Sequence, residues 1–592
     1  MFTTRPDLTG TFGMVATTHW IASTVGMKLL EQGGTAADAA AAAGFTLNVV
    51  EPHLNGPLGD MPLLLRPAGA DQPTVICGQG PAPAAATIER YRSEGLNRIP
   101  GSGLLAACVP GAFDAWMLLL RDHGRLPLRA VMEPAIHYAE HGHPALARMC
   151  SAIAGLADFF RAEWPTSAET WLPGGAVPEP GRLFRNPALA AFWSRLLDEA
   201  ETATGREAQI ETARRTFAEG FVAEAIDTYL RDARVMDAEG DRRPGVLTAD
   251  DMAGWRAGYE ATAFTTHHGW EVHKPGFWSQ GPVQLQALNM LENDDLSGLD
   301  PLGPEFVHLT TEALKRAFAD REAYYGDGDI PAATLLDKAY AATRRADIGD
   351  SASLDHRPGA IPGYEQLADA FLRRAATDYA AGPGTGAGEP TMAHLSERRG
   401  DTVHLDVIDR WGNIVSATPS GGWLQSNPVI PGLGVPLGTR AQMFWLDEGL
   451  PTSLAPGRRP RTTLSPSLAR DENGRWLSYG TPGGDQQDQW QLMFFLRHVH
   501  HGMTMQQAID APLFYTDHLQ ASFYPRNVNP GHLKVEERFA RETIEALRAK
   551  GHRLEISGPW DVGRLTAAAR DADGMLHGAA TARLMQAYAV GR

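Results

Sequence analysis

The clearest alternation of apolar and polar residues lies in residues 400–413, "GDTVHLDVIDRWGN". Val403, Leu405 and Val407 occupy every second position, and the segment ends on Gly412-Asn413. A period of two predicts a half-buried strand, and the glycine-containing pair predicts the turn of a β-hairpin that runs through residues 402–420.

The same pattern predicts a second hairpin in residues 461–484, "RTTLSPSLARDENGRWLSYGTPGG", which turns at Asn473-Gly474 and ends on a glycine pair. Elsewhere helical spacing dominates. Two helices are predicted before residue 53, separated by Gly33-Gly34, and residues 150–250 are predicted to be mostly helical. Further helices are predicted at residues 110–124, 126–142, 304–326, 489–502, 505–512 and 538–551. A mainly helical first part followed by hairpins and helices predicts an α+β architecture.

Between these two parts, residues 376–400 are rich in Gly, Ala, Pro and Ser, which predicts a flexible linker or an exposed loop. The linker leads directly into the strand that starts near Thr402. The chain of 592 residues is long enough for one very large domain or several smaller ones.

Charge and cysteine content narrow the class of protein. The net charge of −17 opposes nucleic-acid binding and gives no reason to expect an anionic membrane partner. Cys77, Cys108 and Cys150 are widely spaced, which predicts neither a disulfide framework nor a zinc site. With no secretory signal at the start and no long apolar run, we expect a cytoplasmic protein.

Two histidine-rich segments, "HVHHG" and "HHGWEVH", are candidates for metal ligation. Neither has the HExxH spacing or a nearby cysteine, so we expect no metal and no cofactor. The histidines concerned are His498, His500 and His501 in one segment and His267, His268 and His273 in the other. The glycines of "GPGTGAG" lack the Lys-Ser/Thr of a phosphate loop, and no GxSxG motif occurs.

Thr402 is the remaining candidate for chemistry. If the chain is cut just before it, its new α-amino group, with a pKa of about 8, can serve as the base for its own hydroxyl. The linker upstream would let the new chain end move away. On composition and pattern alone, an ordinary strand threonine remains the favoured interpretation.

Several sequence blocks in a fixed order favour a catalytic role for Thr402 over that of an ordinary strand residue. They are "GMVATTHWIASTVGMKLLEQGGTAADAAAAAGFTLNVVEPH", "QGPVQLQALNMLE", "LTTEALKRAFADREAYYGD", "DTVHLDVIDRWGNIVSAT", "LAPGRRPRTTLSPSL", "YGTPGGDQQ" and "QQAIDAPLF". Through them nearly the whole chain resembles the gamma-glutamyltranspeptidase family of N-terminal-nucleophile hydrolases. The resemblance implies a four-layer αββα sandwich with a mainly helical large-subunit portion, residues 1–401, and a small-subunit portion, residues 402–592.

The resemblance also assigns roles. It places the nucleophile at Thr402, autocleavage at the Asp401–Thr402 bond, and a supporting hydroxyl at Ser420. The backbone N–H groups of Gly483 and Gly484 would form the oxyanion hole, because glycine lets the backbone approach a tetrahedral intermediate closely. Thr462 and Thr463 would contact the substrate carboxylate, and His404 is expected to be structural.

The chain departs from the family pattern where a γ-glutamyl group would be held. Ile88 stands in place of the arginine that grips the α-carboxylate, with Arg90 two residues on, and Met443 in place of the acid that holds the α-amino group. Gly422 replaces an expected asparagine, and "GPLGDMPLLL" lacks a long glycine run. Arg440 and Arg461 replace uncharged residues; we expect one of them to bind an acyl carboxylate, with a surface ion pair equally open.

The resemblance implies a self-cleaving amidohydrolase or acyltransferase whose two fragments form a heterodimer and whose partner is a small-molecule amide. Three substrate classes stay open: γ-glutamyl compounds such as glutathione, a cephalosporin side chain, and an oxamate-like monoamide. The alternative from another class is an unprocessed relative that only binds.

Overall fold

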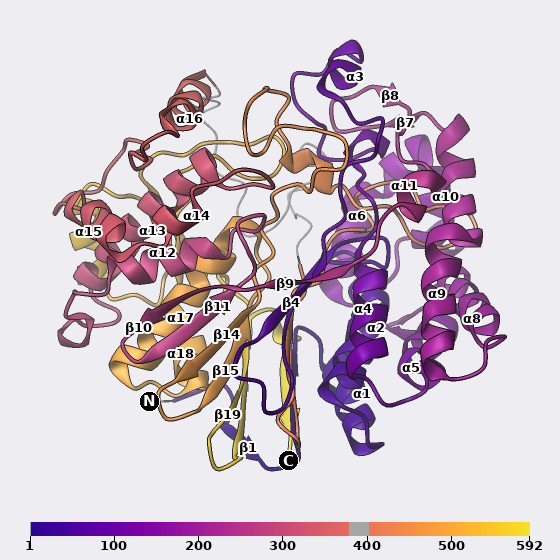
Figure 1. The fold of residues 1–592 in the computed structure, drawn as a ribbon, viewed down its shortest axis with the longest axis horizontal. Coiled ribbons are helices and arrows are strands. Elements are labelled where there is room, and N and C mark those ends of the chain that lie inside the picture. The colour runs from indigo at the N-terminus through magenta and orange to yellow at the C-terminus, as the bar shows by residue number, and fades with distance from the viewer. Residues whose placement is uncertain (1, 378–401) are drawn as a thin grey trace.

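The computed structural model describes residues 2–377 and 402–592. Most of the predicted linker and Asp401 lie outside the described residues. Two seven-stranded antiparallel sheets face each other in the centre of the molecule, with helices on both outer sides (Figure 1). This arrangement confirms the expected α+β class and the four-layer αββα sandwich.

Each sheet combines strands from before and after residue 401. The first sheet contains, in spatial order, β1 (Leu8–Gly10), β20 (Leu576–Ala580), β19 (Thr566–Arg570), β15 (Trp476–Gly480), β14 (Ser467–Asp471), β11 (Trp270–Lys274) and β10 (Ala263–His267). The second contains β21 (Tyr588–Gly591), β2 (Gly13–Thr17), β12 (Leu405–Asp409), β13 (Ile414–Ala417), β3 (Met61–Arg66), β4 (Thr74–Gly78) and β9 (Gly258–Ala261). Smaller pairings are made by β5 (His143–Pro144) with β6 (Leu183–Phe184), β7 (Val235–Met236) with β8 (Arg242–Arg243), and β16 (Phe514–Tyr515), β17 (His532–Glu536) and β18 (Arg553–Ser557).

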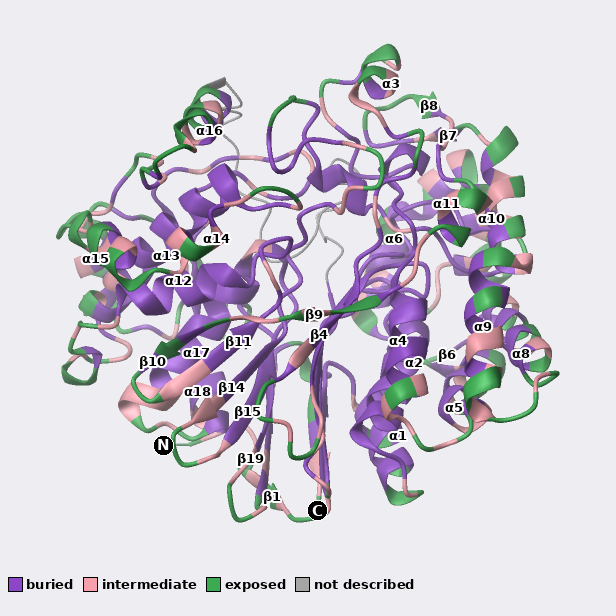
Figure 2. Ribbon diagram, in the orientation of Figure 1, coloured by how far each residue is buried: buried purple, intermediate pink, exposed green. Residues whose placement is uncertain are grey.

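Helices from the first half of the chain lie on the outer side of the second sheet. Its strands are contacted by α1 (Trp20–Glu31), α2 (Ala36–Val50) and α4 (Ala112–His123). Outside these helices lie α5 (Leu128–His141), α8 (Pro187–Ala200), α9 (Arg206–Glu219) and α10 (Phe221–Asp232). Helix α2 is buried at every position, as Figure 2 shows, because its alanine-rich surface lets it pack between the sheet, α1 and α5. Near these helices lie α3 (Ile88–Ser93), α6 (Ala147–Glu163), α7 (Pro165–Trp171) and α11 (Ala249–Ala253).

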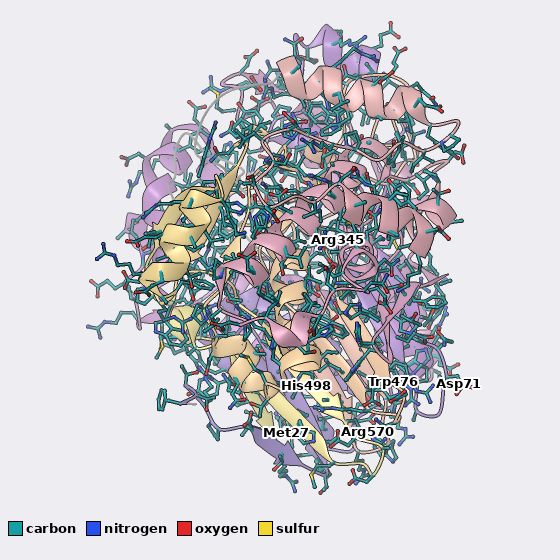
Figure 3. All side chains as sticks on the ribbon, turned by 90° about the vertical axis from the view of Figure 1, so that its left-hand side faces the viewer. Met27, Asp71, Arg345, Trp476, His498 and Arg570 are labelled. Atoms are coloured by element: carbon teal, nitrogen blue, oxygen red, sulfur yellow. The ribbon has the colours of Figure 1, made fainter. Side chains whose placement is uncertain are left out.

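The opposite layer covers the first sheet, and Figure 3 faces this side. It contains α12 (Pro282–Met290), α13 (Pro304–Tyr324), α14 (Ala332–Leu335), α15 (Lys338–Ala346), α16 (Glu365–Thr377), α17 (Gln487–His501), α18 (Met505–Asp510) and α19 (Arg541–Ala549). The predicted helices are confirmed within a few residues of their ends. Among the described helices, none combines the length and the apolar character needed to cross a membrane.

Both predicted hairpins are confirmed. Leu405 pairs with Ala417 across β12 and β13, and the turn residue Gly412 has a φ of +91°. The expectation of a half-buried strand is wrong, because all five residues of β12 are buried. Asp406 of β12 faces the first sheet instead of water, whereas Asp409 lies on the opposite face and accepts from the N–H of Ala36 at the start of α2, at 2.8 Å. The alternation therefore separates a helix-covered face from a face that lies between two sheets.

Asp406 is the polar residue at the centre of this interface. Its carboxylate accepts hydrogen bonds from Ser478 of β15, from Thr566 of β19 at 2.8 Å, and from Ser416 of β13 at 3.3 Å. His404 lies 3.1 Å away. One fully buried carboxylate thus joins the two sheets.

We expect Asp406→Asn to lower the free energy of unfolding by about 2–3 kcal/mol, because hydrogen bonds to a buried charge are lost and one amide oxygen replaces two carboxylate oxygens. Thermal or urea unfolding measures this change. Asp573→Asn, at an exposed turn where the side-chain oxygen still accepts from Met575, is the matched control and should stay within about 0.5 kcal/mol of wild type. Equal stability of the two variants would contradict the role given to Asp406.

Candidate active site

The hairpin brings Thr402 and Ser420 together. Leu405 pairs with Ala417, so the residues three positions outward on each strand lie opposite each other. The Thr402 hydroxyl donates to the Ser420 hydroxyl at 3.2 Å, and the N–H of Val403 donates to the Pro419 carbonyl at 3.1 Å. Both hydroxyl residues are buried, at 0% and 1% exposure. The structure therefore places the expected nucleophile beside its expected supporting hydroxyl.

Ser420 is fixed from behind by the segment before β3. Ser420 and Asp60 exchange two backbone hydrogen bonds, each of 2.9 Å. A side chain at Gly59 would place its Cβ only 2.0 Å from the Ser420 carbonyl oxygen, so this approach requires glycine. The shortened "GPLGD" sequence thus keeps the glycine that the close contact needs.

Arg440 lies next to this contact. Its Nε is 2.8 Å from Asp60 Oδ2, and one terminal nitrogen donates to Oδ1 at 3.0 Å. Both side chains are buried. Burial raises the pKa of Asp60, and the Arg440 guanidinium opposes that rise. Arg440 therefore forms a buried ion pair with Asp60, the residue whose backbone is hydrogen-bonded to Ser420. This buried pair differs from the surface ion pair that the sequence left open.

Strand β15 carries the glycine pair to the same end of the sandwich. Gly480, its last residue, packs against His404: a Cβ built there would lie 2.2 Å from the imidazole ring. Three residues later Gly483 has a φ of +132° and Gly484 a φ of +54°. Helix α17 begins at Gln487, so the pair precedes a helix N-terminus, where backbone N–H groups and the helix dipole favour negative charge.

Gln280 links the glycine pair to the hydroxyl pair. Its side-chain amide donates to the Gly484 carbonyl at 2.9 Å, and its backbone N–H donates to the Thr462 carbonyl at 2.9 Å. Thr462 and Thr463 are both buried. Thr462 therefore lies on a segment that is hydrogen-bonded, through Gln280, to the loop that carries Gly483 and Gly484. We call this loop the oxyanion loop, after the role expected for the two glycines. Gln280 was not singled out from the sequence, since a glutamine at a helix start carries no distinctive signal.

Arg461 belongs to a buried network of charges. One terminal nitrogen lies 2.7 Å from Glu322 Oε1, and a nitrogen of Arg321 lies at the same distance from that oxygen. Arg321 also pairs with Asp485, which follows the glycine pair, at 2.5 Å. Burial alone would raise the pKa of Glu322, but Arg461 and Arg321 lower it to about 2. Arg461 is thus tied to the oxyanion loop through Arg321.

Two more guanidinium groups interact with this network. Burial lowers the pKa of Arg526 to about 9, Glu322 opposes the change, and repulsion from Arg374 and Arg461 adds to it. Four arginines (Arg321, Arg374, Arg461 and Arg526) thus interact with two carboxylates, those of Glu322 and Asp485. The group carries more positive than negative charge. The network escaped the sequence analysis because its members come from α13, α16 and three separate loops.

At the positions that depart from the glutamyl pattern, the side chains are either packed among apolar residues or already paired with another charge. Met443 is buried in a cluster with Trp423 and Phe523. Arg90 lies on α3 and pairs with Glu94 at 2.8 Å, on the partly exposed surface of that helix. His404 has one ring nitrogen 2.9 Å from the Thr418 hydroxyl and the other beside Asp406, which matches the structural role expected for it.

Comparison with known proteins gives one consistent answer. The family model described as Gamma-glutamyltranspeptidase matches residues 22–591. The oxamate amidohydrolase proenzyme of Klebsiella pneumoniae is 32% identical over 97% of both chains. The solved structure described as LmbA2991T421A is 51% identical, with a TM-score of 0.93 over the full length of both chains. Cephalosporin acylase from Bacillus halodurans is 26% identical with a TM-score of 0.82, covering 100% of this chain and 98% of the other. The chain therefore belongs to the gamma-glutamyltranspeptidase family of self-processed amidohydrolases and acyltransferases.

Proposed function

We propose that Thr402 first cuts the chain from Asp401 and then cleaves an acyl amide whose acyl group carries a carboxylate. The observation that carries the proposal is the buried Thr402 hydroxyl beside Ser420, at the end of the strand that follows the linker. In the first reaction, the Thr402 oxygen attacks the Asp401 carbonyl carbon. The peptide C–N bond breaks, which frees the Thr402 amino group and leaves Asp401 joined to the Thr402 oxygen as an ester. Water then hydrolyses this ester, which releases the Asp401 carboxylate and restores the Thr402 hydroxyl.

The second reaction uses the freed amino group, whose pKa is about 8 in the reference state. This group takes the proton from the Thr402 hydroxyl, and the oxygen attacks the substrate's amide carbon. The N–H groups of Gly483 and Gly484 stabilise the oxyanion. The amine leaves with the proton, and water or a second amine resolves the acyl-enzyme ester by hydrolysis or transfer.

The two portions, residues 1–401 and 402–592, would stay together after cleavage as a heterodimer. Strand β12 of the second portion lies between β2 of the first and β13, and β14 pairs with β11 of the first. Separating the portions would break both sheets and expose their apolar faces. The test is a denaturing gel with mass analysis of the purified protein. Two fragments that co-migrate under native conditions are expected, and a single uncut chain would favour the binding homologue.

For the substrate, we infer an acidic acyl group in place of γ-glutamyl. Met443 lies in an apolar cluster where the family resemblance requires an acid, and Ile88 offers no charge for an α-carboxylate. A bound α-amino group would be buried without a partner, at a cost of several kcal/mol. A substrate with a single carboxylate, by contrast, suits the network around Arg461, which contains four arginines and two carboxylates and lies next to Thr462. The relative described as an oxamate amidohydrolase supports the same class, because oxamate is an amide whose acyl group carries a carboxylate.

We expect Arg461→Gln to lower kcat/KM for glutaryl and oxalyl anilides by about 30- to 100-fold, since a charged group loses its partner at a cost of about 2–3 kcal/mol. Acetyl anilide, which has no carboxylate, should change by less than about threefold. The measurement is steady-state kinetics on processed protein, with γ-glutamyl anilide on the same panel.

Arg90→Gln is the matched control, because Arg90 pairs with Glu94 on α3 and lies outside the Arg461 network. Thermal unfolding of each variant separates loss of the fold from loss of recognition. An equal fall for acetyl and glutaryl anilides would show that Arg461 supports only the oxyanion loop. A preference for γ-glutamyl anilide in the wild type would overturn the inferred substrate class and leave the Thr402 chemistry standing.

A further inference from the structure

Three histidines from the two histidine-rich segments meet on the outer side of the first sheet. His267 ends β10, His268 lies in the two-residue turn to β11, and His500 lies in the last turn of α17. One ligand nitrogen of each lies within 4.8 Å of the other two. Each segment alone lacks the spacing of a metal motif. The fold brings the three ligands together, because the β10–β11 turn packs against the end of α17, more than 200 residues later in the chain.

The hydrogen bonds of His267 define its tautomer. Its Nδ1 faces two acceptors, the Leu288 carbonyl at 3.1 Å and Glu292 Oε2 at 2.9 Å, so Nδ1 carries the hydrogen. Its Nε2 therefore has a lone pair, and this atom lies 2.9 Å from His500 Nε2. A carboxylate that holds the remote nitrogen of an imidazole is the usual second-layer support of a metal-bound histidine.

His268 presents its ring to the same place. Its Nε2 lies 3.0 Å from the Glu292 carbonyl and donates to it, which leaves the lone pair on Nδ1. The residue has a φ of +45°, a conformation that glycine or asparagine adopts more readily than histidine. The ring lies 4.5 Å from that of His500, centroid to centroid. His268 is exposed, so solvent reaches the cluster from this side.

The charge around the cluster also suits a cation. The Glu292 carboxylate lies beside the three imidazoles, with Oε2 2.9 Å from His267 Nδ1. Lys338 Nζ lies 3.2 Å from Glu292 Oε2 and, among the residues that the structure describes, is the one opposing charge in direct contact with this carboxylate.

A second cluster, formed by His308, Glu312 and His552, is less suited to a cation because a positive charge lies inside it. There Lys315 Nζ lies 2.5 Å from Glu312 Oε1, so an ammonium group already neutralises the carboxylate inside the cluster. Lys315 and Lys550 also contribute, after burial, to lowering the pKa of His552 to about 3. A divalent cation would be repelled by this ammonium group. The second cluster therefore serves as an internal comparison.

We propose that His267, His268 and His500 bind one divalent transition metal ion of the zinc class, with Glu292 supporting His267. Two nitrogens on a tetrahedral zinc ion lie about 3.4 Å apart, given a Zn–N distance of about 2.1 Å, so the His267–His500 pair needs to open by only about half an ångström. The fourth ligand would be water from the exposed side. Imidazole ligands suit Zn²⁺, Ni²⁺ and Cu²⁺.

The site lies far from the chemistry of Thr402. Helix α17 begins just after Gly484 and has 15 residues, so its two ends are about 22 Å apart. The metal would thus be structural, joining the β10–β11 turn to the end of the helix that follows the oxyanion loop. Figure 3 faces this side and labels His498, which lies in the same last turn of α17.

The test is titration of Zn²⁺ into the full, chelator-treated protein, followed by calorimetry and by thermal unfolding. Wild type should bind one ion per chain and unfold at a higher temperature with Zn²⁺ present. His500→Gln and His267→Gln should weaken binding at least 100-fold, and Glu292→Gln by about 10- to 100-fold. The Cu²⁺-loaded protein should show the spectrum of nitrogen ligation.

His498→Gln is the matched control, since its Nδ1 faces the Met503 carbonyl at 2.7 Å and it lies outside the cluster. This variant should bind Zn²⁺ like wild type. His552→Gln should also keep the site. Unchanged Zn²⁺ affinity in His500→Gln, or loss of the ion in His552→Gln, would overturn the proposal. Amidase activity is expected to be the same with and without Zn²⁺, so the outcome is independent of the proposed function.

Discussion

A Thr402→Ala protein is expected to remain a single chain of 592 residues and to lose at least about 10⁴-fold in amidase activity. Both losses have one cause. In the proposed mechanism, the hydroxyl that attacks the Asp401 carbonyl during processing is the hydroxyl that attacks the substrate. Alanine has neither a nucleophile nor a donor for Ser420. Mass analysis of the intact protein and steady-state kinetics on an acyl anilide measure the two effects separately.

Two further variants show whether the loss comes from chemistry or from packing. Thr402→Ser keeps the hydroxyl and should still be cut, more slowly, because serine lacks the methyl group that restricts χ1. Ser420→Ala removes the partner at 3.2 Å and should slow turnover by about 2- to 10-fold, the value of one ordinary hydrogen bond. A Thr402→Ala protein that was still cut before residue 402 would exclude Thr402 as the processing nucleophile.

Local pattern was sufficient for the elements that carry Thr402. The alternation in residues 402–409 and the glycine-containing turn predicted the hairpin, and the hairpin register alone sets Thr402 opposite Ser420. The amphipathic and alanine-rich helices were equally visible, because their spacing is a property of each segment by itself. The order of the αββα layers came from the family resemblance, since strand pairings such as β12 with β2 join residues about 390 positions apart.

The parts that escaped prediction depend on contacts between distant segments. Asp406 looked like the solvent side of a strand, and only the contact with the first sheet shows that its carboxylate is an internal acceptor. For Arg440, the sequence left a substrate carboxylate and a surface ion pair equally open, and the structure shows a buried ion pair with Asp60. His267 and His500 were each judged within their own segment, where neither spacing indicates a metal. In each case the sequence shows which chemical group the side chain carries, but it does not show which distant residue lies beside that group in the fold.

Gly483→Ala is expected to lower kcat by about 10²- to 10³-fold, the usual cost of losing one oxyanion donor. Gly483 has a φ of +132°, which L-residues rarely adopt, and a Cβ there would lie 2.3 Å from Cζ3 of Trp490. Trp490 is fully buried, so the ring has little room to move and the loop must shift instead. That shift would turn the Gly483 N–H group away from the proposed oxyanion position. KM should change little, because the oxyanion forms only after binding.

Steric strain alone would also destabilise the protein, by about 1–3 kcal/mol, so two controls separate strain from catalysis. Gly574→Ala introduces a comparable positive-φ strain, at +95°, in the β19–β20 turn, where the nearest atom is 3.6 Å away, and should leave kcat unchanged. In the Gly483→Ala/Trp490→Phe double variant, the smaller ring relieves the clash and restores part of the stability. Because the φ strain persists, kcat should stay low. Recovery of kcat in parallel with stability would show that Gly483 provides only packing space, and the oxyanion donor would then have to lie elsewhere in the loop.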